Sequence, residues 1–482
     1  MSNENRQFDA VVVGSGPNGL AAAIALARAK KQVLVLEASD TLGGGLRSAE
    51  LTLPGFVHDM CAEVLPLTVG SPFLSTLPLS EFGLRLLQPE IPLAHPHDGG
   101  RAAVLHRSID RTAHGLGADG AAYHRLMEPI VAGWRPLLGM LLGPFRWPAQ
   151  PLMLARFGLA AILPATVLAR VNFRQAPAQA LLAGVSAHSI LPLERPVSAA
   201  FGLVLAMLAH AVGWPVARGG SQRVADALVG YLGSLGGQTR TSVHINSTAE
   251  LPRHGATLLD LTPRQVLPIA GTELPNRYRQ QLASYRYGPG VFKIDWALET
   301  PIPWQAEACR AAGTVHLGGT LAEVASAEAA VWRGEHPARP FVILAQPTIV
   351  DPSRAPAEQH IAWAYCHVPN GSTVDMTGAI EAQVERFAPG FGRRILARST
   401  RHACQMEAHN SNYVGGDING GVQDLLQLWT RPVARRDPYA TPNPRIFICS
   451  SATPPGGGVH GMCGYYAARS ALRRLSISAG RG

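Results

Sequence analysis

The most constraining feature of this sequence is a glycine-rich loop between an apolar run and a helix-like segment near the start of the chain. Residues 8–13 (FDAVVV) form an apolar run that predicts a buried strand. Residues 14–19 read Gly-Ser-Gly-Pro-Asn-Gly, and the alanine-rich residues 19–30 predict a helix. A second apolar strand then ends at Glu37. This order of strand, loop, helix, strand and acid predicts a dinucleotide-binding βαβ unit.

Each loop position has a physical reason. Gly14 permits the tight turn, Gly16 lets the backbone approach a pyrophosphate, and Gly19 permits close packing of helix on strand. The pyrophosphate is expected at the helix N-terminus, where free N–H groups and the helix dipole favour an anion. Glu37 can accept hydrogen bonds from a ribose diol. The cofactor contacts expected in this unit are Gly14, Ser15, Gly16, Pro17, Asn18, Gly19, Glu37 and Ala38.

Two further glycine-rich stretches decide which dinucleotide is expected. Residues 43–47 read Gly-Gly-Gly-Leu-Arg, and residues 456–464 hold five glycines between a strand-like RIFICSS and a helix-like YYAARSAL. Glycine costs conformational entropy, so these loops are expected to bring the backbone close to another group. A simple nicotinamide site does not need them, whereas an extended FAD must also be held at its flavin end. No second complete dinucleotide-binding unit follows in mid-chain, which argues against a separate NADPH domain.

The N-terminal stretch from Val11 to Ser48 resembles FAD-dependent amine-oxidase-like flavoproteins, in particular the phytoene-desaturase-related oxidoreductases. Later stretches resemble the same group: GWPVARGGSQRV (213–224), LLDLTPRQVL, FKIDWAL (292–298), ERFAPGF and GGDI. Within it, the chain is most similar to the subgroup containing pyridine nucleotide-disulfide oxidoreductase domain-containing protein 2. Despite the word disulfide in that name, the six cysteines of the present sequence include no C-x-x-C pair.

The resemblance implies an α/β fold: a discontinuous Rossmann-type FAD-binding domain with an inserted α+β substrate or cap domain. The FAD-binding domain is expected to comprise residues 1–75, 213–272 and 436–482, and the substrate domain residues 76–212 and 273–435. The first glycine loop would then hold the pyrophosphate, while the last would lie along the flavin. The further FAD contacts implied are Gly44, Gly45, Leu46, Arg47, Val243, Ser451, Gly458, Val459, Gly461 and Met462.

Candidate catalytic side chains are few. His58 and Asp59 match a polar pair in the relatives, and His188 lies beside an apolar segment. A histidine can exchange protons near neutral pH and could serve as acid or base. A hydrogen-bonded structural role is the alternative for each of these residues, and the flavin alone could carry the chemistry.

The late loop departs from its relatives at the substrate side of the ring. There the usual motif continues with threonine, glycine, alanine and proline, whereas this chain has His460, Met462 and Cys463. His460 is therefore a fourth catalytic candidate. Altered specificity, tuning of the flavin and simple packing all remain open for these residues, as does a covalent flavin link through Cys463.

Charge and cysteine usage argue against several other classes. The net charge of +9 suggests a nucleic-acid partner, but only three of the 42 basic residues are lysines and the arginines are scattered. We therefore expect no nucleic-acid partner. The cysteines are too widely spaced for a zinc site or a disulfide scaffold, and no metal is expected. The N-terminus has no signal-like pattern, so the expected location is the cytoplasm.

Residues 134–214 are apolar, broken by prolines and interspersed with arginines. The longest uncharged run between residues 134 and 173, residues 157–169, has 13 residues, fewer than the roughly 20 that span a bilayer. Two interpretations stay open: helices lying in a membrane interface with arginines reaching lipid phosphates, or cap helices packed on the core or at a homodimer interface. The helix expected over 197–213 could line a substrate tunnel. Either arrangement favours an apolar substrate.

The sequence therefore predicts an FAD-dependent oxidoreductase that acts on a hydrophobic substrate of polyene, isoprenoid or lipid-like type. Desaturation, saturation and isomerisation are the reactions that this chemistry allows. An amine-oxidase-like reaction on a small amine is an alternative, and Lys293 keeps it open. A flavin-stabilised regulatory or interaction protein with little turnover is a third hypothesis. The expected partner is a hydrophobic small molecule, with peripheral membrane contact and homodimerisation both open.

Overall fold

The apolar run at the start of the chain forms the middle strand of a five-stranded parallel sheet. The computed structural model describes residues 8–479. In spatial order the strands are β16 (Ile446–Ile448), β10 (His254–Leu259), β1 (Phe8–Val13), β2 (Val33–Leu36) and β9 (Gln238–Arg240). The sheet thus draws its strands from the three separated segments that were expected to make up the FAD-binding domain.

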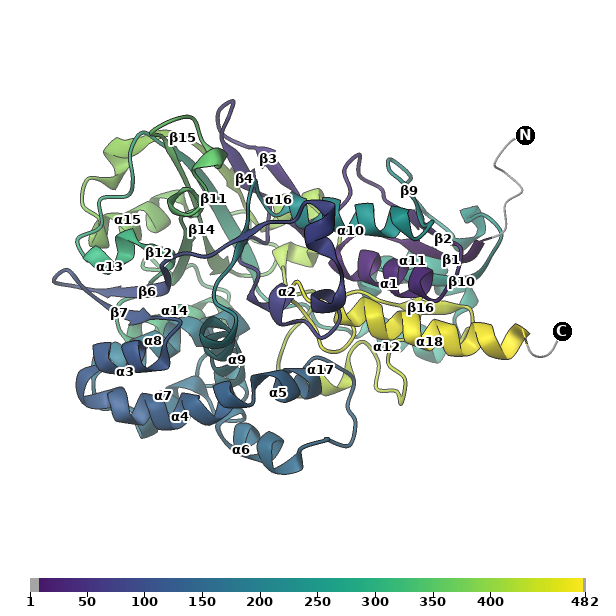
Figure 1. The fold of residues 1–482 in the computed structure, drawn as a ribbon, viewed down its shortest axis with the longest axis horizontal. Coiled ribbons are helices and arrows are strands. Elements are labelled where there is room, and N and C mark those ends of the chain that lie inside the picture. Colours follow the sequence, from purple (N-terminus) through teal and green to yellow (C-terminus); the bar gives the residue numbers. More distant parts are fainter. Residues whose placement is uncertain (1–7, 480–482) are drawn as a thin grey trace.

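Helices cover both faces of this sheet because its strands are apolar on both sides. Ala10 and Val12 pack toward one helical layer, and Val11 and Val13 pack toward the other. The first layer is α1 (Pro17–Arg28), α10 (Gln222–Ser234) and α18 (Met462–Ala479), and the second is α11 (Pro263–Ala270) and α12 (Asn276–Ala283). α18 lies along α1, so the two ends of the described chain meet here (Figure 1). α12 belongs to the second layer of the parallel sheet. The sequence had instead assigned residues 273–435, which include α12, to the substrate domain.

A second, mostly antiparallel sheet of seven strands forms the other half of the molecule (Figure 1). Its strands are, in spatial order, β15 (Ile395–Arg401), β11 (Gly290–Leu298), β14 (His360–Val368), β13 (Val342–Ala345), β12 (Ala312–Leu317), β6 (Ile91–His97) and β7 (Arg101–Leu105). Only the β12–β6 pairing is parallel. One face packs on α13 (Glu307–Arg310) and α15 (Thr377–Phe387), and α14 (Leu321–Trp332) and α8 (Ala176–Ser186) contact the sheet as well.

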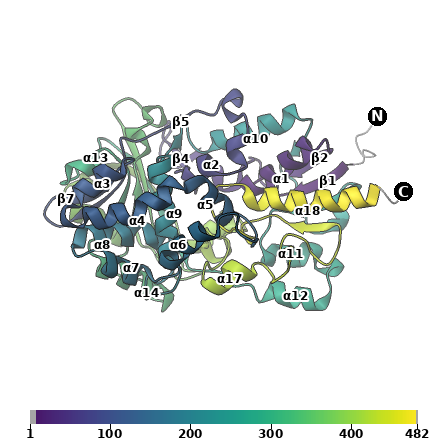
Figure 2. The ribbon, with the colours of Figure 1, turned by 60° about the horizontal axis from the view of Figure 1, so that its bottom comes forward.

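The apolar segment folds into a helical layer around α9 (Ser198–Ala211), which corresponds to the helix expected over 197–213 (Figure 2). The helices packed on α9 include α4 (Gly120–Ala132), α5 (Trp134–Leu141), α6 (Pro151–Ala161), α7 (Ala165–Asn172) and α8. In residues 8–479 no single helix has the length and apolarity to cross a membrane. The pair α6 and α7, bent by 96°, meets both criteria only when taken together.

Short elements connect the two halves. The hairpin of β3 (Ser48–Glu50) and β4 (Val57–Asp59) and the pair of β5 (Leu86–Leu87) and β8 (Val216–Ala217) form two small antiparallel sheets. The remaining helices are α2 (Pro66–Gly70), α3 (Ile109–Gly115), α16 (Ala403–His409) and α17 (Leu425–Thr430). A cavity lies between the two halves, lined by the carboxyl ends of the parallel strands and by residues of β12, β13 and β14.

Candidate FAD and substrate site

A cavity of about 910 Å³ joins the carboxyl end of the parallel sheet to the second sheet. Ligands of open α/β sheets bind beyond the carboxyl ends of the strands, so the position itself favours a cofactor site. On the side of the parallel sheet the wall comes from the first glycine loop, Glu37, Val243 and Asp260. On the other side it comes from His188, Trp214, Thr314, Ile343, Ala345, Trp363 and Tyr365.

Most of the residues expected to hold FAD line this cavity. They are Gly14, Ser15, Gly16, Pro17, Asn18, Glu37, Ala38, Gly44, Gly45, Arg47, Val243, Ser451, Gly458 and Val459. Four others lie behind the wall: Gly19, Leu46, Gly461 and Met462. The structure therefore brings the three glycine loops together around one space.

The first loop keeps its shape because side chains would not fit there. Gly14 has a φ of +99°, which favours glycine. A Cβ on Gly19 would overlap the carbonyl oxygen of Gly14, and a Cβ on Gly16 would lie 2.7 Å from the Asp260 carboxylate. The loop and the start of α1 therefore present bare backbone to the cavity.

Glu37 braces the same loop while facing the cavity. Its Oε2 accepts hydrogen bonds from the Ser15 amide at 2.9 Å and the Ser15 hydroxyl at 2.6 Å, and its Oε1 accepts one from the Ser39 amide at 3.0 Å. The Val243 amide donates to the Glu37 carbonyl at 2.9 Å, which places Val243 beside this acid. The acid that follows β2 and Val243, one of the implied FAD contacts, thus lie side by side on the cavity wall.

Arg47 is a guanidinium on the cavity wall, held in place by three neighbours. It donates to the Ser39 hydroxyl at 2.6 Å, the Gly44 carbonyl at 3.0 Å and the His409 carbonyl at 3.2 Å. Because these bonds fix its position beside the loops, Arg47 can contribute positive charge to a bound diphosphate.

The late glycine loop, residues 456–464, lines the cavity with some of its residues and lets two helices pack closely with another. Gly457, Gly458 and Val459 line the cavity, as expected for a loop that lies along the flavin. Gly464 has another role, because a Cβ there would overlap the carbonyl oxygen of Asn18 in α1. The glycine at 464 therefore permits close packing of α18 on α1, which brings the late loop to the first loop.

Of the four catalytic candidates, only His188 lines the cavity. Its Nε2 lies 3.0 Å from the Nε2 of His316, which sits on β12. Burial lowers the pKa of His188 to about 3. The ring is therefore neutral at ordinary pH. One proton lies between the two Nε2 atoms, so one of the two rings donates this hydrogen bond and the other accepts it.

The structure corrects the roles expected for His58 and Asp59. Neither lines the cavity, and both are buried in a polar network between the sheets. Asp59 accepts hydrogen bonds from the Ser221 amide at 2.7 Å and from Arg354 at 2.8 Å. His58 Nδ1 lies 3.5 Å from Asp295, and burial, with Lys293 and Arg354 nearby, lowers the pKa of His58 to about 3. Arg354, which lies between β13 and β14, thus holds the β3–β4 hairpin through Asp59 and the Val57 carbonyl.

His460 and Cys463 are also buried behind the cavity wall. His460 Nδ1 accepts a hydrogen bond from the Met462 amide at 3.0 Å, and burial lowers the pKa of His460 to about 4. The Cys463 thiol points to the Thr453 carbonyl at 3.4 Å, and burial raises its pKa to about 11. His460 thus caps the start of α18 and Cys463 packs within its first turn, and neither side chain belongs to the described cavity wall.

The substrate side of the cavity was not found from the sequence. Trp363 and Tyr365 stack with ring centroids 5.9 Å apart and planes 9° from parallel, and both line the cavity. The Trp363 indole donates to Glu63, also on the wall, and burial raises the pKa of Glu63 to about 8. Alternate residues of a buried strand point to one face, so β14 carried a signal, but only the fold shows which face meets the cavity.

Lys293 lies behind Trp363. Its Nζ is 5.2 Å from the centre of the indole ring and pairs with Asp295, and the residue is 2% exposed. It is absent from the described cavity wall. In residues 8–479, no group of three or more His, Cys, Asp or Glu side chains could hold a metal ion.

Comparison with known proteins agrees with this geometry. Residues 12–75 match the NAD(P)-binding Rossmann-like domain family. The chain is 26% identical to mouse pyridine nucleotide-disulfide oxidoreductase domain-containing protein 2, covering 97% of this chain and 94% of that protein. It is also 30% identical to a limonene dehydrogenase subunit from Castellaniella defragrans, over 24% of this chain and 20% of that protein.

Two solved structures share the fold. An oxidoreductase from Methanosarcina mazei has a TM-score of 0.65 and 16% identity, covering 97% of this chain and 100% of its own. Cyclohexylamine oxidase from Brevibacterium oxydans has a TM-score of 0.57 and 13% identity, covering 98% of this chain and 100% of its own.

FAD fits the site that these residues build. Bare glycine backbone at the start of α1 suits a diphosphate, Glu37 and Val243 suit the adenosine end, and the late loop suits the flavin end. The chain therefore has a Rossmann-like dinucleotide-binding domain that fits FAD and an amine-oxidase-type fold, and it is similar along nearly its whole length to pyridine nucleotide-disulfide oxidoreductase domain-containing protein 2.

Proposed function

We propose that this protein is an FAD-dependent oxidoreductase that acts on a hydrophobic substrate of polyene, isoprenoid or lipid-like type by desaturation, saturation or isomerisation. The observation that carries the proposal is the far wall of the cavity, where Trp214, Ile343, Ala345, Trp363 and Tyr365 offer mostly apolar surface. Such a wall favours a substrate that gains from burial of carbon rather than from many hydrogen bonds.

The chain's own residues would position this substrate. Bound FAD supplies the hydride acceptor or donor. The stacked rings of Trp363 and Tyr365 would hold a flat unsaturated segment, because aromatic rings pack well against such faces. His188 lines the same cavity as these rings. Since its Nε2 is engaged with His316, its Nδ1 would exchange a proton with the substrate.

One relative supports a hydrocarbon substrate. The name limonene dehydrogenase describes a reaction on a small isoprenoid hydrocarbon, and the matched stretch covers 114 residues. Because that stretch is only part of each chain, we take it as support for the substrate class and not for limonene itself.

The surface of the helical layer supports contact with a membrane, from which such a substrate would come. Apolar side chains stand exposed on α6, α7, α17 and the loop after α5; Trp147 is 89% exposed and Leu152 is 87% exposed. We define the apolar face as Phe145, Trp147, Leu152, Leu159, Ile162, Val167, Val171, Leu425, Leu426 and Trp429. Contact between the Phe145 and Trp429 rings, with centroids 5.3 Å apart, joins its two parts.

The charge around the apolar face fits anionic lipid headgroups. Residues 129–193 contain five arginines and no aspartate or glutamate, and these arginines are exposed. Exposed tryptophan with flanking arginine is the pattern of a segment lying in a membrane interface. We therefore propose a cytoplasmic protein that contacts a membrane peripherally, with a second copy of the chain as the competing occupant of this face.

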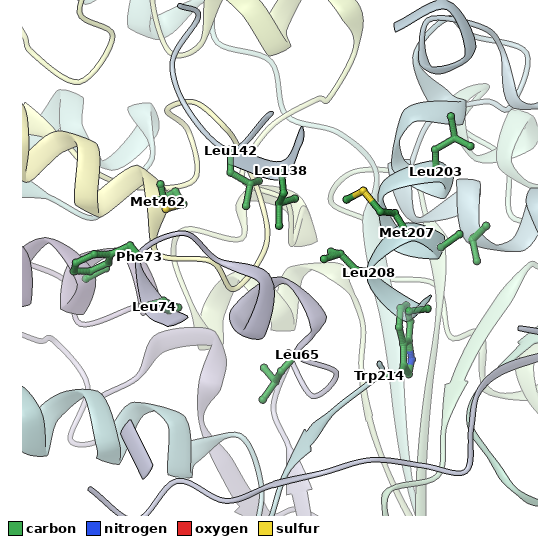
Figure 3. Packing of buried hydrophobic residues seen from close by; sticks show 14 of the residues in the cluster. Leu65, Phe73, Leu74, Leu138, Leu142, Leu203, Met207, Leu208, Trp214 and Met462 are labelled. Atoms are coloured by element: carbon green, nitrogen blue, oxygen red, sulfur yellow. The ribbon is translucent and has the colours of Figure 1, made fainter. Parts of the chain in front are cut away.

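Apolar packing continues inward from this layer. Leu138 and Leu142 lie near Leu208 and Met207 of α9, and Trp214 lies beyond them (Figure 3). However, no residue of α9 belongs to the described cavity wall, so α9 is a packed core helix and does not line a tunnel as the sequence suggested. Trp214 belongs both to this core and to the cavity wall.

A small amine is the second candidate substrate. The parallel Trp363 and Tyr365 rings could flank an amine, and cyclohexylamine oxidase shares the fold. Against it, Lys293 is paired with Asp295 behind the wall, where it is not placed to hold a water in the cavity.

Anaerobic bleaching of the flavin absorption band separates these functions. The proposal expects bleaching by a monoterpene or polyene presented in detergent or vesicles, or reoxidation of photoreduced flavin by an unsaturated acceptor. Bleaching by cyclohexylamine but by no hydrocarbon would establish the amine candidate instead. Flavin that binds and can be photoreduced but reacts with neither class would support the low-turnover regulatory protein.

A further inference from the structure

The strand β10 ends in an acid that the sequence analysis did not single out. Asp260 lies at the carboxyl end of β10, lines the cavity and is 6% exposed. Its Oδ2 accepts a hydrogen bond from the Gly19 amide at 2.9 Å. A Cβ on Gly16 would lie 2.7 Å from the same oxygen. The carboxyl group therefore sits directly against the dinucleotide loop.

The N-terminus of α1 has few amides to offer an anion. Pro17 has no N–H, the Leu20 amide returns to the Gly16 carbonyl, and the Gly19 amide is taken by Asp260. The N-terminus of a helix attracts negative charge through these amides and its dipole. Asp260 thus occupies part of the position that the diphosphate of FAD needs, and the two groups carry the same sign of charge when Asp260 is ionised.

Nothing basic compensates Asp260 within residues 8–479: no lysine, arginine or histidine forms an ion pair or hydrogen bond with its carboxyl group. The titratable groups that face it are Glu37 after β2, Cys449 after β16 and Cys463 on α18. Asn412 donates only to the Asp260 backbone carbonyl, at 2.9 Å. Burial raises the pKa of Asp260 to about 7; the amides of Gly19 and Gly16 oppose the shift and Glu37 adds to it.

We propose that Asp260 couples FAD binding to the uptake of one proton, so that the diphosphate binds the loop when Asp260 is protonated. This inference rests on the FAD site and is independent of the substrate. A second negative group beside Asp260 favours its protonated form, so the bound protein keeps the proton to a higher pH than the free protein. Affinity for FAD is then constant at acid pH and falls as the free protein ionises, by up to about tenfold per pH unit.

Titration of the apoprotein with FAD between pH 5.5 and 8.5, followed by flavin fluorescence, tests this directly. Wild type is expected to lose ten- to a hundredfold in affinity across the range. Asp260→Asn can still accept the Gly19 hydrogen bond through its amide oxygen, so the loop keeps its brace, and its affinity is expected to be independent of pH. Asp226→Asn is the matched control, because Asp226 is an exposed acid on α10 paired with Arg223, and it should keep the wild-type pH dependence.

Calorimetry of wild type in two buffers of different ionisation enthalpy tests the proposal without any variant. With FAD and with ADP, which has the diphosphate, we expect uptake of up to about half a proton near pH 7 and of up to one proton near pH 8; we expect none with adenosine. Three results would overturn the proposal while leaving the FAD assignment intact. These are a wild-type affinity for FAD that does not change with pH, the same slope of affinity against pH in wild type and Asp260→Asn, and binding without proton uptake. Failure of FAD to bind at any pH would overturn both.

Discussion

His188 and His316 meet through their Nε2 atoms, 3.0 Å apart, at the wall of the cavity. His188 comes from the turn after α8, and His316 comes from β12, so the pair joins the helical layer to the second sheet. His316 is fully buried, and its Nδ1 has no hydrogen-bond partner in the described structure. Because burial also lowers the pKa of His316, the pair carries no charge and can orient the His188 ring toward the substrate.

Replacing His188 tests its proposed proton transfer. His188→Gln is expected to slow substrate-dependent flavin reduction by about a hundredfold or more, since positioned acid–base groups contribute that much. Stopped-flow absorbance measures the rate, and FAD affinity should not change because His188 lies on the substrate side. His316→Gln should have a smaller effect, as it acts only by orienting His188. A wild-type rate in His188→Gln would show that the flavin alone carries the chemistry.

The low pKa of His188 sets a pH dependence. A histidine whose pKa is about 3 is neutral at all pH values well above 3. Between pH 5 and 8, the rate of flavin reduction at saturating FAD should therefore show no inflection from His188. The rate should fall only in more acid solution, where the His188 ring becomes protonated. A clear inflection near pH 6.5 that disappears in His188→Gln would contradict the buried, uncharged state.

Glu63 should make folding stability depend on pH. Burial raises the pKa of Glu63 to about 8, whereas its ordinary value is 4.5. Folded Glu63 therefore keeps a proton that the unfolded chain has lost, and stability falls as pH rises from about 4.5 to about 8. Glu63→Gln removes this ionisation, so its stability relative to wild type should rise between pH 5 and 8. Urea unfolding at several pH values measures the difference; a constant difference would refute the raised pKa.

Two glycine variants separate close packing from helix propensity. Gly464→Ala should destabilise the protein by about 1–3 kcal/mol, because the new methyl group would overlap the Asn18 carbonyl. Gly139 lies on α5, and a Cβ built there meets no atom within 4 Å. Gly139→Ala should therefore leave the free energy of unfolding unchanged or raise it by up to about 1 kcal/mol. Thermal and urea unfolding give both values. Equal effects would mean that α18 does not need glycine to approach α1.

Substituting the apolar face tests membrane contact. Trp147→Ser with Leu152→Ser should reduce co-sedimentation with anionic vesicles at least severalfold, because both side chains are exposed and their removal costs little packing. Leu53→Ser, an exposed apolar residue remote in sequence from this face, is the control. If the wild-type protein does not co-sediment with vesicles but dimerises through the apolar face, this face binds a second copy of the chain and not a membrane.

The local parts of the site could be predicted from the sequence because they depend on neighbouring residues. The turn at Gly14, the helix after it and the acid at Glu37 all follow from the order of residues within one βαβ unit. The late glycine loop could be linked to the first loop only through a resemblance to known flavoproteins. The structure then supplied the physical reason, since Gly464 lets α18 pack against Asn18 of α1.

The sequence by itself determined the dinucleotide-binding unit and the glycine loops, because backbone geometry and periodicity are short-range properties. Only the tertiary structure decided which polar side chains reach the cavity. His58 and His188 look alike as isolated histidines, but one is buried away from the cavity with its Nε2 bonded to Thr52, and the other lines the cavity beside His316. Asp260 likewise gained its meaning from a contact with Gly19, 241 positions away in the chain. Burial and charge at such positions depend on long-range packing, which residue spacing does not encode.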